Sequence, residues 1–278
     1  MNGIFFIMIS FPNAKINLGL NILSKREDGY HNISSCFYPV PWCDILEIIP
    51  SDQLKFTSSG IGIPGDESNN LCIQAYRLLK RDFNIPNVHI HLHKIIPIGA
   101  GLGGGSSDCA FTLKMLKDMF CLKLSDDQLE NYAGTLGSDC PFFIKNKPTM
   151  VSGTGNQFKT TSLSLSGNAI VIAYPKIHIS TLEAYAGITP MIPEQSIMDI
   201  ISEPIFNWKS KLKNDFEKTL LKNYPEIINI KELMYEYGAN YASMTGSGSA
   251  VFGIFNNKVA GNLLDVLSKK CIIGSYQL

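Results

Sequence analysis

The chain has 278 residues, of which 45% are apolar and 17% are charged, and its 24 basic residues balance its 24 acidic ones. A domain commonly takes about 150 residues, so this length predicts one large or two ordinary domains. It also suffices for a buried core without disulfides or a structural metal. The zero net charge argues against a nucleic-acid binder and against a disordered chain, so we expect no nucleic-acid partner.

The first apolar run extends only from Ile4 to Ile9, far short of the roughly 20 residues that a membrane helix needs. No lysine or arginine precedes it, which is unlike a signal peptide. We expect it to begin a strand, with Met8 a possible true start and residues 1–7 a short extension. No other stretch approaches a membrane span, so we expect no membrane partner. The seven cysteines include no C-x-x-C pair, which predicts reduced thiols in a cytoplasmic protein and no zinc site.

In the first half of the chain, alternation and spacing predict strands and helices. Residues 11–23 alternate as a strand does and place Lys15 and Asn17 on one face. A turn follows at Asp28-Gly29. We expect further strands over residues 43–50 and 88–95, and helices over residues 69–83 and 107–120.

A third helix is marked by a capping box of Ser125 and Gln128 and by Gly137 at its end. In the second half we expect a strand over residues 169–174, helices over 212–221 and 226–237, and a glycine turn entering a strand over 244–255. The Ser/Thr-rich residues 160–167 indicate a domain junction or a polar edge strand. Because strands and helices do not alternate regularly, the fold class is α+β.

The strongest local signal is the glycine-rich segment 97–108, PIGAGLGGGSSD, in which five of the seven residues 99–105 are glycine. It follows a predicted strand and opens a predicted helix. Glycines let the backbone bend and approach a ligand, Ser106 and Ser107 can cap the helix, and the free N–H groups at a helix start attract phosphate. The segment predicts an anion-binding loop, with a flexible hinge as the alternative.

Two familiar nucleotide loops fit this segment poorly. A Walker A loop needs a lysine after its glycines, and none follows here. Gly99, Gly101 and Gly104 satisfy G-x-G-x-x-G, but a second helix follows where a dinucleotide fold would place a strand that ends in an acidic residue. An NAD-dependent oxidoreductase therefore remains only a distant alternative.

Three segments together resemble the motifs of the GHMP kinases, a family of galactokinase, homoserine kinase, mevalonate kinase and phosphomevalonate kinase. They are PNAKINLGL (12–20), the glycine loop (97–107) and MTGSGSAVFG (244–253). The resemblance implies a two-domain α+β GHMP kinase fold. Residues 1–162 would form a ribosomal protein S5 domain 2-like N-terminal domain, and residues 163–278 a ferredoxin-like C-terminal domain.

Two more segments, KREDGYHNI (25–33) and LGSDCPFF (136–143), are similar to a branch of the family whose substrate is a cytidine diphosphate-linked sugar alcohol. The resemblance implies a small-molecule kinase that uses ATP, with Mg²⁺ bound alongside it. It also implies a cytoplasmic monomer or weak homodimer. Ser107 is a candidate contact for Mg²⁺, but the sequence assigns no protein ligand to the metal.

By the same resemblance, Asp139 is the catalytic base and Lys15 its partner. A neighbouring lysine keeps an aspartate ionised, and phosphoryl transfer needs a base and an offset of developing charge. Alone, a turn aspartate and a strand lysine are more often structural. The implied ATP-binding residues are Pro97, Ile98, Gly99, Ala100, Gly101, Leu102, Gly103, Gly104, Gly105, Ser106, Ser107, Asn70 and Lys94.

The implied substrate-binding residues are Asn17, Tyr30, His31, Thr181 and Tyr185. Asn17 would lie near the transferred group, the Tyr30-His31 pair would hold the cytosine, and Tyr185 would stack on its other face. By resemblance, Asn70 would lie near the adenine and Lys94 near the phosphates of ATP, and the alternative for Asn70 is a helix-start residue alone.

His89, His91 and His93 share one strand face, which suits a metal site or, more commonly, a polar surface. The rival functions are a GHMP kinase for another alcohol, such as homoserine or mevalonate, and a non-catalytic nucleotide-binding protein.

Overall fold

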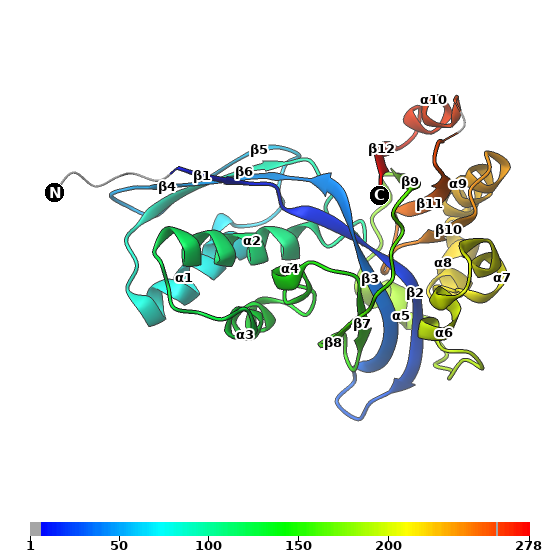
Figure 1. The fold of residues 1–278 in the computed structure, drawn as a ribbon, viewed down its shortest axis with the longest axis horizontal. Coiled ribbons are helices and arrows are strands. Elements are labelled where there is room, and N and C mark those ends of the chain that lie inside the picture. The colour runs from blue at the N-terminus through cyan, green and yellow to red at the C-terminus, as the bar shows by residue number, and fades with distance from the viewer. Residues whose placement is uncertain (1–6, 260) are drawn as a thin grey trace. The chain divides into compact units, whose positions relative to one another are not determined.

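The structure is a computed structural model that describes residues 7–259 and 261–278 (Figure 1). The expected N-terminal extension falls almost wholly on residues 1–6, outside the described residues. The first strand, β1 (Met8–Ser10), begins where the apolar run ends. Within the described ranges, no helix is long and apolar enough to cross a membrane.

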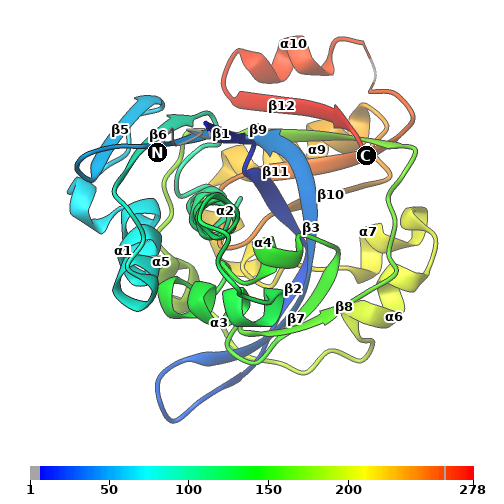
Figure 2. The same ribbon diagram turned by 60° about the vertical axis from the view of Figure 1, so that its left-hand side comes forward.

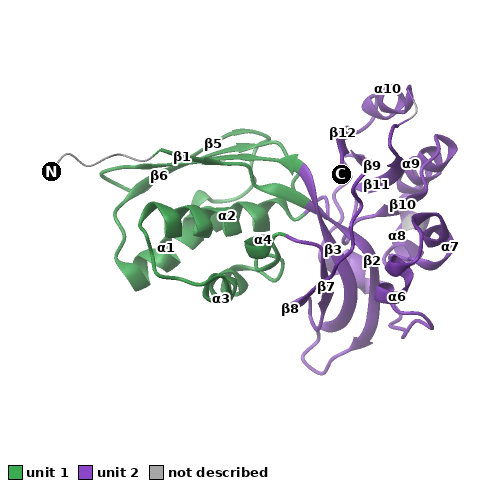
Figure 3. Cartoon of the chain, in the orientation of Figure 1, with its two compact units in different colours: residues 1–14, 42–98, 103–146 green, residues 15–41, 99–102, 147–278 purple. Residues whose placement is uncertain are grey.

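The chain divides into two compact units (Figure 3). Unit 1 comprises residues 1–14, 42–98 and 103–146, and unit 2 comprises residues 15–41, 99–102 and 147–278. The glycine loop thus contributes its middle, residues 99–102, to unit 2 and its two ends to unit 1. The predicted family-domain boundary between residues 162 and 163 stays a prediction.

Unit 1 contains a four-stranded sheet in the order β1-β4-β6-β5, with only β5 and β6 parallel. Its other strands are β4 (Ile45–Pro50), β5 (Lys55–Gly60) and β6 (Val88–Lys94). One face of this sheet is covered by α1 (Leu71–Phe83) and α2 (Gly104–Met119), as Figures 1 and 2 show. The remaining elements are η1 (Glu67–Asn69), α3 (Asp126–Leu136) and α4 (Phe142–Lys145).

A second sheet has the order β2-β3-β7-β8. Its strands are β2 (Asn13–Lys25), β3 (His31–Cys43), β7 (Thr149–Ser152) and β8 (Gln157–Thr160). The expected strand over residues 11–23 is confirmed as β2. Both of its faces are buried, so the side chains of Lys15 and Asn17 do not face solvent.

The third sheet, in unit 2, is antiparallel with the order β10-β11-β9-β12. It consists of β9 (Asn168–Tyr174), β10 (Tyr241–Met244), β11 (Val251–Asn256) and β12 (Ile272–Gln277). Helices α9 (Pro225–Glu236) and α10 (Leu263–Ser268) pack on it. The βαββαβ succession is consistent with the ferredoxin-like prediction. The shorter helices are α5 (Thr181–Ala186), α6 (Ile197–Ser202), η2 (Ile205–Asn207), α7 (Trp208–Lys211) and α8 (Glu217–Asn223).

Two local expectations were wrong. The helix expected over residues 212–221 begins only at Glu217, because residues 213–215 bond to β2: Leu20 N donates to Lys213 O (2.9 Å), and Asp215 N donates to Leu20 O (2.8 Å). Helix α2 begins at Gly104, earlier than expected, and its N-cap is Gly103. Ser106 and Ser107 therefore lie inside the first turns and do not cap it. By contrast, the capping box of Ser125 and Gln128 is confirmed.

Candidate active site

The glycine loop turns through left-handed backbone at Gly99, Gly101 and Gly103, whose φ angles are 67°, 79° and 71°. Glycine adopts this conformation without the steric cost that a Cβ brings. At Gly101 there is a second reason, since a Cβ there would lie 2.1 Å from the Thr245 carbonyl oxygen. The loop therefore passes so close to the segment 244–253 that position 101 has no room for a side chain.

Three segments far apart in sequence meet in unit 2 at the carbonyl oxygen of Gly101. Lys15 Nζ and Thr245 Oγ1 both donate to it, each at 3.2 Å. Lys15 Nζ also donates to Asn17 Oδ1 at 2.6 Å, and Asn17 N donates to Thr245 Oγ1 at 3.0 Å. All three side chains are buried. The three motifs predicted from sequence thus form one hydrogen-bonded group, which we call the Gly101 cluster: Lys15, Asn17, Gly101 and Thr245.

A hydrogen bond from its nitrogen fixes the orientation of the Asn17 side-chain amide. Its Nδ2 donates to Ser35 Oγ (2.9 Å), which donates to Gly19 O (2.6 Å). Because the nitrogen is held there, the amide oxygen faces Lys15. The Lys15 ammonium also lies 4.5 Å from the centre of the Phe37 ring, a distance at which the ring face attracts a cation.

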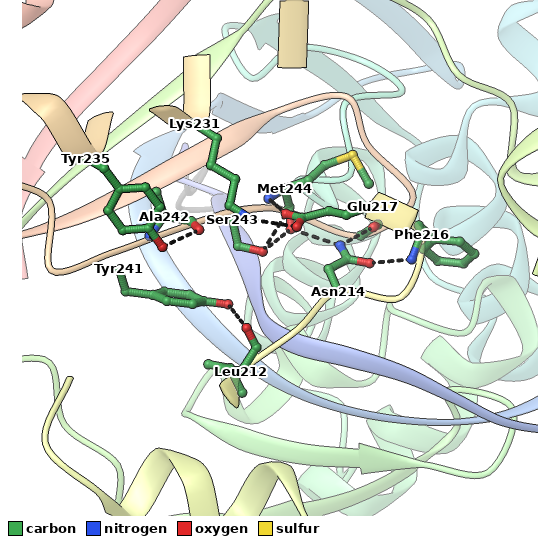
Figure 4. A network of polar contacts seen from close by, with 11 residues as sticks. Leu212, Asn214, Phe216, Glu217, Lys231, Tyr235, Tyr241, Ala242, Ser243 and Met244 are labelled. Carbon is green, nitrogen blue, oxygen red and sulfur yellow. Dashed lines mark hydrogen bonds and ion pairs between the residues drawn. The ribbon is translucent and has the colours of Figure 1, made fainter. Parts of the chain in front are cut away.

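A buried polar network holds the chain next to Thr245 (Figure 4). Glu217 Oε1 accepts from Met244 N (2.8 Å) and Ser243 Oγ (3.0 Å), and Glu217 Oε2 pairs with Lys231 at 2.6 Å. Asn214 Nδ2 donates to the carbonyls of Met244 and Gly246, both at 2.9 Å. Sequence reasoning missed Asn214 and Glu217 because it placed them inside one ordinary helix.

In unit 1, Lys94 is buried between two carboxylates. Its Nζ lies 2.5 Å from Asp44 Oδ2 and 2.7 Å from Asp108 Oδ2, and all three side chains are at most 4% exposed. Burial alone would lower the pKa of Lys94, but the charges of Asp108 and Asp44 outweigh it and the pKa is raised. The ammonium is therefore held charged. Its predicted contact with ATP phosphates stays a prediction.

Two polar atoms at the start of α2 are buried without a hydrogen-bond partner among the described residues: Ser107 Oγ and Asp108 Oδ1. Burial raises the pKa of Asp108 to about 7, although the nearby Lys94 charge acts to lower it. Buried polar groups without partners are rare in native proteins, and each calls for an explanation. Both atoms lie at the end of the glycine-rich segment 97–108.

Asp139 lies half-buried in the turn between α3 and α4, as expected. Helices α3 and α4, which flank this turn, both pack against α2, the helix that the loop opens. Hydrogen bonding with Cys109, and after it with Ser106, lowers the pKa of the Cys140 thiol, although burial acts to raise it. Asp139 belongs to unit 1 and Lys15 to unit 2, and their pairing stays a prediction.

The predicted substrate residues lie in unit 2. The His31 and Tyr185 rings stack with centroids 4.8 Å apart, and Tyr185 meets Phe216 edge-on at 4.9 Å. Tyr30, which directly precedes His31 in the chain, is exposed, and so is Thr181 at the start of α5. The structure therefore brings His31 and Tyr185 together, but the two rings would have to separate to hold a base between them.

The structure gives Asn70 and the histidine row structural roles. Asn70 caps α1, with Oδ1 accepting from Cys72 N at 2.9 Å, so it is a helix start whether or not it also contacts adenine. The row of His89, His91 and His93 is bridged by hydroxyls: Thr57 bonds the first two, and Ser59 the last two. Within the described residues, no group of His, Cys, Asp or Glu could hold a metal ion.

Comparisons with known proteins find models of one family in both parts of the chain. The model of the GHMP kinases N terminal domain matches residues 70–147, and that of the GHMP kinases C terminal domain matches residues 198–273. A Cytophaga hutchinsonii relative named 4-diphosphocytidyl-2-C-methyl-D-erythritol kinase is 55% identical over 90% of this chain and 93% of its own. A relative of that name from Parabacteroides distasonis is 51% identical over 89% of this chain and 92% of its own.

Among solved structures, a 4-(cytidine 5'-diphospho)-2C-methyl-D-erythritol kinase superposes with a TM-score of 0.83 at 28% identity. The superposition covers 96% of this chain and 98% of that one. The likeness therefore extends over both compact units, well beyond the short motifs.

The Gly101 cluster predicts that loss of the Thr245 hydroxyl lowers the stability of the protein. Thr245→Val keeps the shape of the side chain but leaves Asn17 N without its acceptor and removes a donor to Gly101 O. We expect the free energy of unfolding to fall by about 1–3 kcal/mol, measured by denaturant titration. Thr245→Ser keeps the hydroxyl and should lose clearly less. Equal losses in the two variants would contradict a role for the hydroxyl.

The raised pKa of Asp108 predicts a pH-dependent stability in the ligand-free protein. The unfolded chain releases this proton near pH 4, whereas the folded protein holds it to about pH 7. The stabilising contribution is therefore present below about pH 4 and is lost as the pH rises through 7. Asp108→Asn removes this dependence, so the variant should gain stability relative to the natural protein between pH 5 and pH 8. Parallel pH profiles of the denaturation midpoint would show the assignment to be wrong.

Proposed function

We propose a function from one premise: this chain belongs to the GHMP kinase family, whose two-domain α+β fold it has. The chain transfers a phosphoryl group from ATP to the 2-hydroxyl of 4-diphosphocytidyl-2-C-methyl-D-erythritol, a step of the non-mevalonate isoprenoid pathway. The observation that carries this proposal is the 55% identity, over 90% of the chain, to a relative that is named for that reaction.

The glycine loop would hold the phosphates of ATP. The N-cap residue of α2, Gly103, has no side chain with which to cap the helix, so the N–H groups of the first turn and the positive end of the helix dipole would be directed at an anion. The left-handed glycines keep this backbone free of side chains. Binding of this kind orients the γ-phosphoryl group, and positioning supplies much of the catalysis in phosphoryl transfer.

Asp139 would accept the proton of the substrate's 2-hydroxyl as its oxygen attacks the γ-phosphorus. The bond from that phosphorus to the bridging oxygen of ADP breaks, and ADP leaves with the electron pair. Lys15 would offset negative charge that develops during transfer. Asn17, which bonds Lys15 directly, would contact the substrate near the reacting hydroxyl. No covalent enzyme intermediate is required.

Magnesium bound with ATP fits one observation: Ser107 offers a buried hydroxyl oxygen without a hydrogen-bond partner among the described residues. Hard cations prefer oxygen ligands, and Mg²⁺ usually retains waters and phosphate oxygens. Ser107 would be the protein contact at this site. When bound, the ion offsets phosphate charge.

The cytosine would be held by Tyr30 and His31, with Tyr185 and Thr181 nearby. Support comes from the His31–Tyr185 stack, because aromatic faces that pack on each other also pack on a base. A cytoplasmic location, a monomer or weak homodimer, and the lack of a nucleic-acid partner remain predictions.

An ADP-release assay tests the proposed substrate. We expect the cytidyl sugar alcohol to stimulate ADP release from ATP, and homoserine and mevalonate to leave it near background. Stimulation by homoserine or mevalonate instead would favour another GHMP kinase activity. ATP binding without turnover on any alcohol would favour a non-catalytic nucleotide-binding protein. NAD binding would revive the oxidoreductase alternative.

The catalytic assignment predicts that Asp139→Asn and Lys15→Met fold but lose turnover, each by about 100-fold or more, since a positioned base and charge contribute at this scale. Circular dichroism checks the fold, and ADP release with the cytidyl substrate measures the rate. Near-normal turnover in both variants would rule the pair out.

A further inference from the structure

We propose that Asp44, a residue outside all of the motifs, is a positioning residue for the phosphate loop: with Lys94 and Asp108 it fixes the two ends of that loop. The inference rests on the proposed function, in which the loop holds the phosphates of ATP. All of the contacts that support it lie in unit 1.

The leading end of the loop is held by one oxygen of Asp44. Asp44 Oδ1 accepts the N–H of Ile95 at 2.6 Å and the N–H of Ile96 at 2.8 Å, immediately before Pro97. Asp44 is itself fixed, because its N–H donates to Pro12 O at 2.9 Å and its side chain is fully buried. Charge-assisted bonds of this kind are stronger than neutral ones.

The trailing end is held through Lys94. Its ammonium bonds the other oxygen of Asp44 and, on its far side, Asp108 in the first turns of α2. The path of the loop thus leaves from Lys94 and returns to it. At Gly104 a Cβ would lie 2.9 Å from Lys94 Nζ and 3.0 Å from Ile96 Cγ2. The helix start therefore rests directly on this buried ion cluster.

The charges explain why Asp44 matters. An ammonium has three donors, and two of those on Lys94 go to Asp44 and Asp108, which leaves one for a phosphate. Removing one partner of a buried ion pair leaves an uncompensated charge, which is strongly unfavourable. Without the Asp44 carboxylate, Lys94 would have to move toward water or toward Asp108, and both ends of the loop would shift with it.

The test is Asp44→Asn in the full chain, which keeps the shape and removes the charge. We expect the KM and the calorimetric Kd for ATP to rise about 10-fold or more, because small misplacements of positioning groups have large effects. The KM for the sugar alcohol should stay within about 2-fold. Amide exchange of residues 97–108 should accelerate in the nucleotide-free protein.

Two control variants separate positioning from general damage. Ile48→Val trims a fully buried side chain of β4, and Asp127→Asn removes an exposed charge that pairs with Lys145. Both should leave the KM for ATP and the exchange of the loop unchanged. If Asp44→Asn instead lowers only kcat, or leaves ATP affinity and loop exchange as they are in the natural protein, the inference is overturned.

A second variant covers the case in which Asp44→Asn does not fold. Gly104→Ala keeps all three side chains of the cluster but pushes a methyl group against Lys94, and it should produce the same selective rise in the KM for ATP. An unchanged KM in that variant would also overturn the inference. If the natural protein neither binds ATP nor releases ADP, the proposed function fails. The exchange measurement then still decides whether Asp44 fixes the loop.

Discussion

The site depends on the close approach of two backbones at Gly101. Its carbonyl receives hydrogen bonds from Lys15 and Thr245, and the Thr245 carbonyl lies where a Cβ of residue 101 would be. Chains can pack this closely only where one of them carries no side chain. The glycine therefore lets the strand that bears Lys15 and the turn that bears Thr245 share one acceptor, and the positions of both side chains follow from it.

The loop is held by different chemistry in its middle and at its ends. In unit 2, hydrogen bonds to carbonyl oxygens hold residues 100–102: Ala250 N donates to Ala100 O and Lys15 N to Leu102 O, while the Lys15 ammonium and the Thr245 hydroxyl donate to Gly101 O. In unit 1, a buried ion cluster holds both ends. Buried ion clusters are costly to desolvate and are weak evidence for stability. Their directional bonds do fix geometry, which the proposed binding of phosphate by the amides of the loop would require.

The parts of this structure that sequence predicts are those with local signals. Two examples are the capping box of Ser125 and Gln128 and the alternation of residues in β2. Each pattern involves residues that are close along the chain, so the sequence alone predicts the element. The burial of Lys15 could not be predicted in this way, since alternation shows two faces but not what covers them. Asp44 and Glu217 gave no signal at all. Several of their partners are distant in sequence: Lys94 lies 50 residues from Asp44, and Ser243 lies 26 residues from Glu217.

The prediction of a serine cap on α2 was wrong for a physical reason. A side-chain cap satisfies one of the free N–H groups at a helix start, so a helix that binds phosphate in the proposed way would keep those groups for its ligand. Here Gly103 occupies the cap position and contributes no side chain. Ser107, placed inside the helix instead, keeps a buried hydroxyl without a protein partner among the described residues. Departures from local rules concentrate at functional sites, and the start of α2 departs from them in both respects.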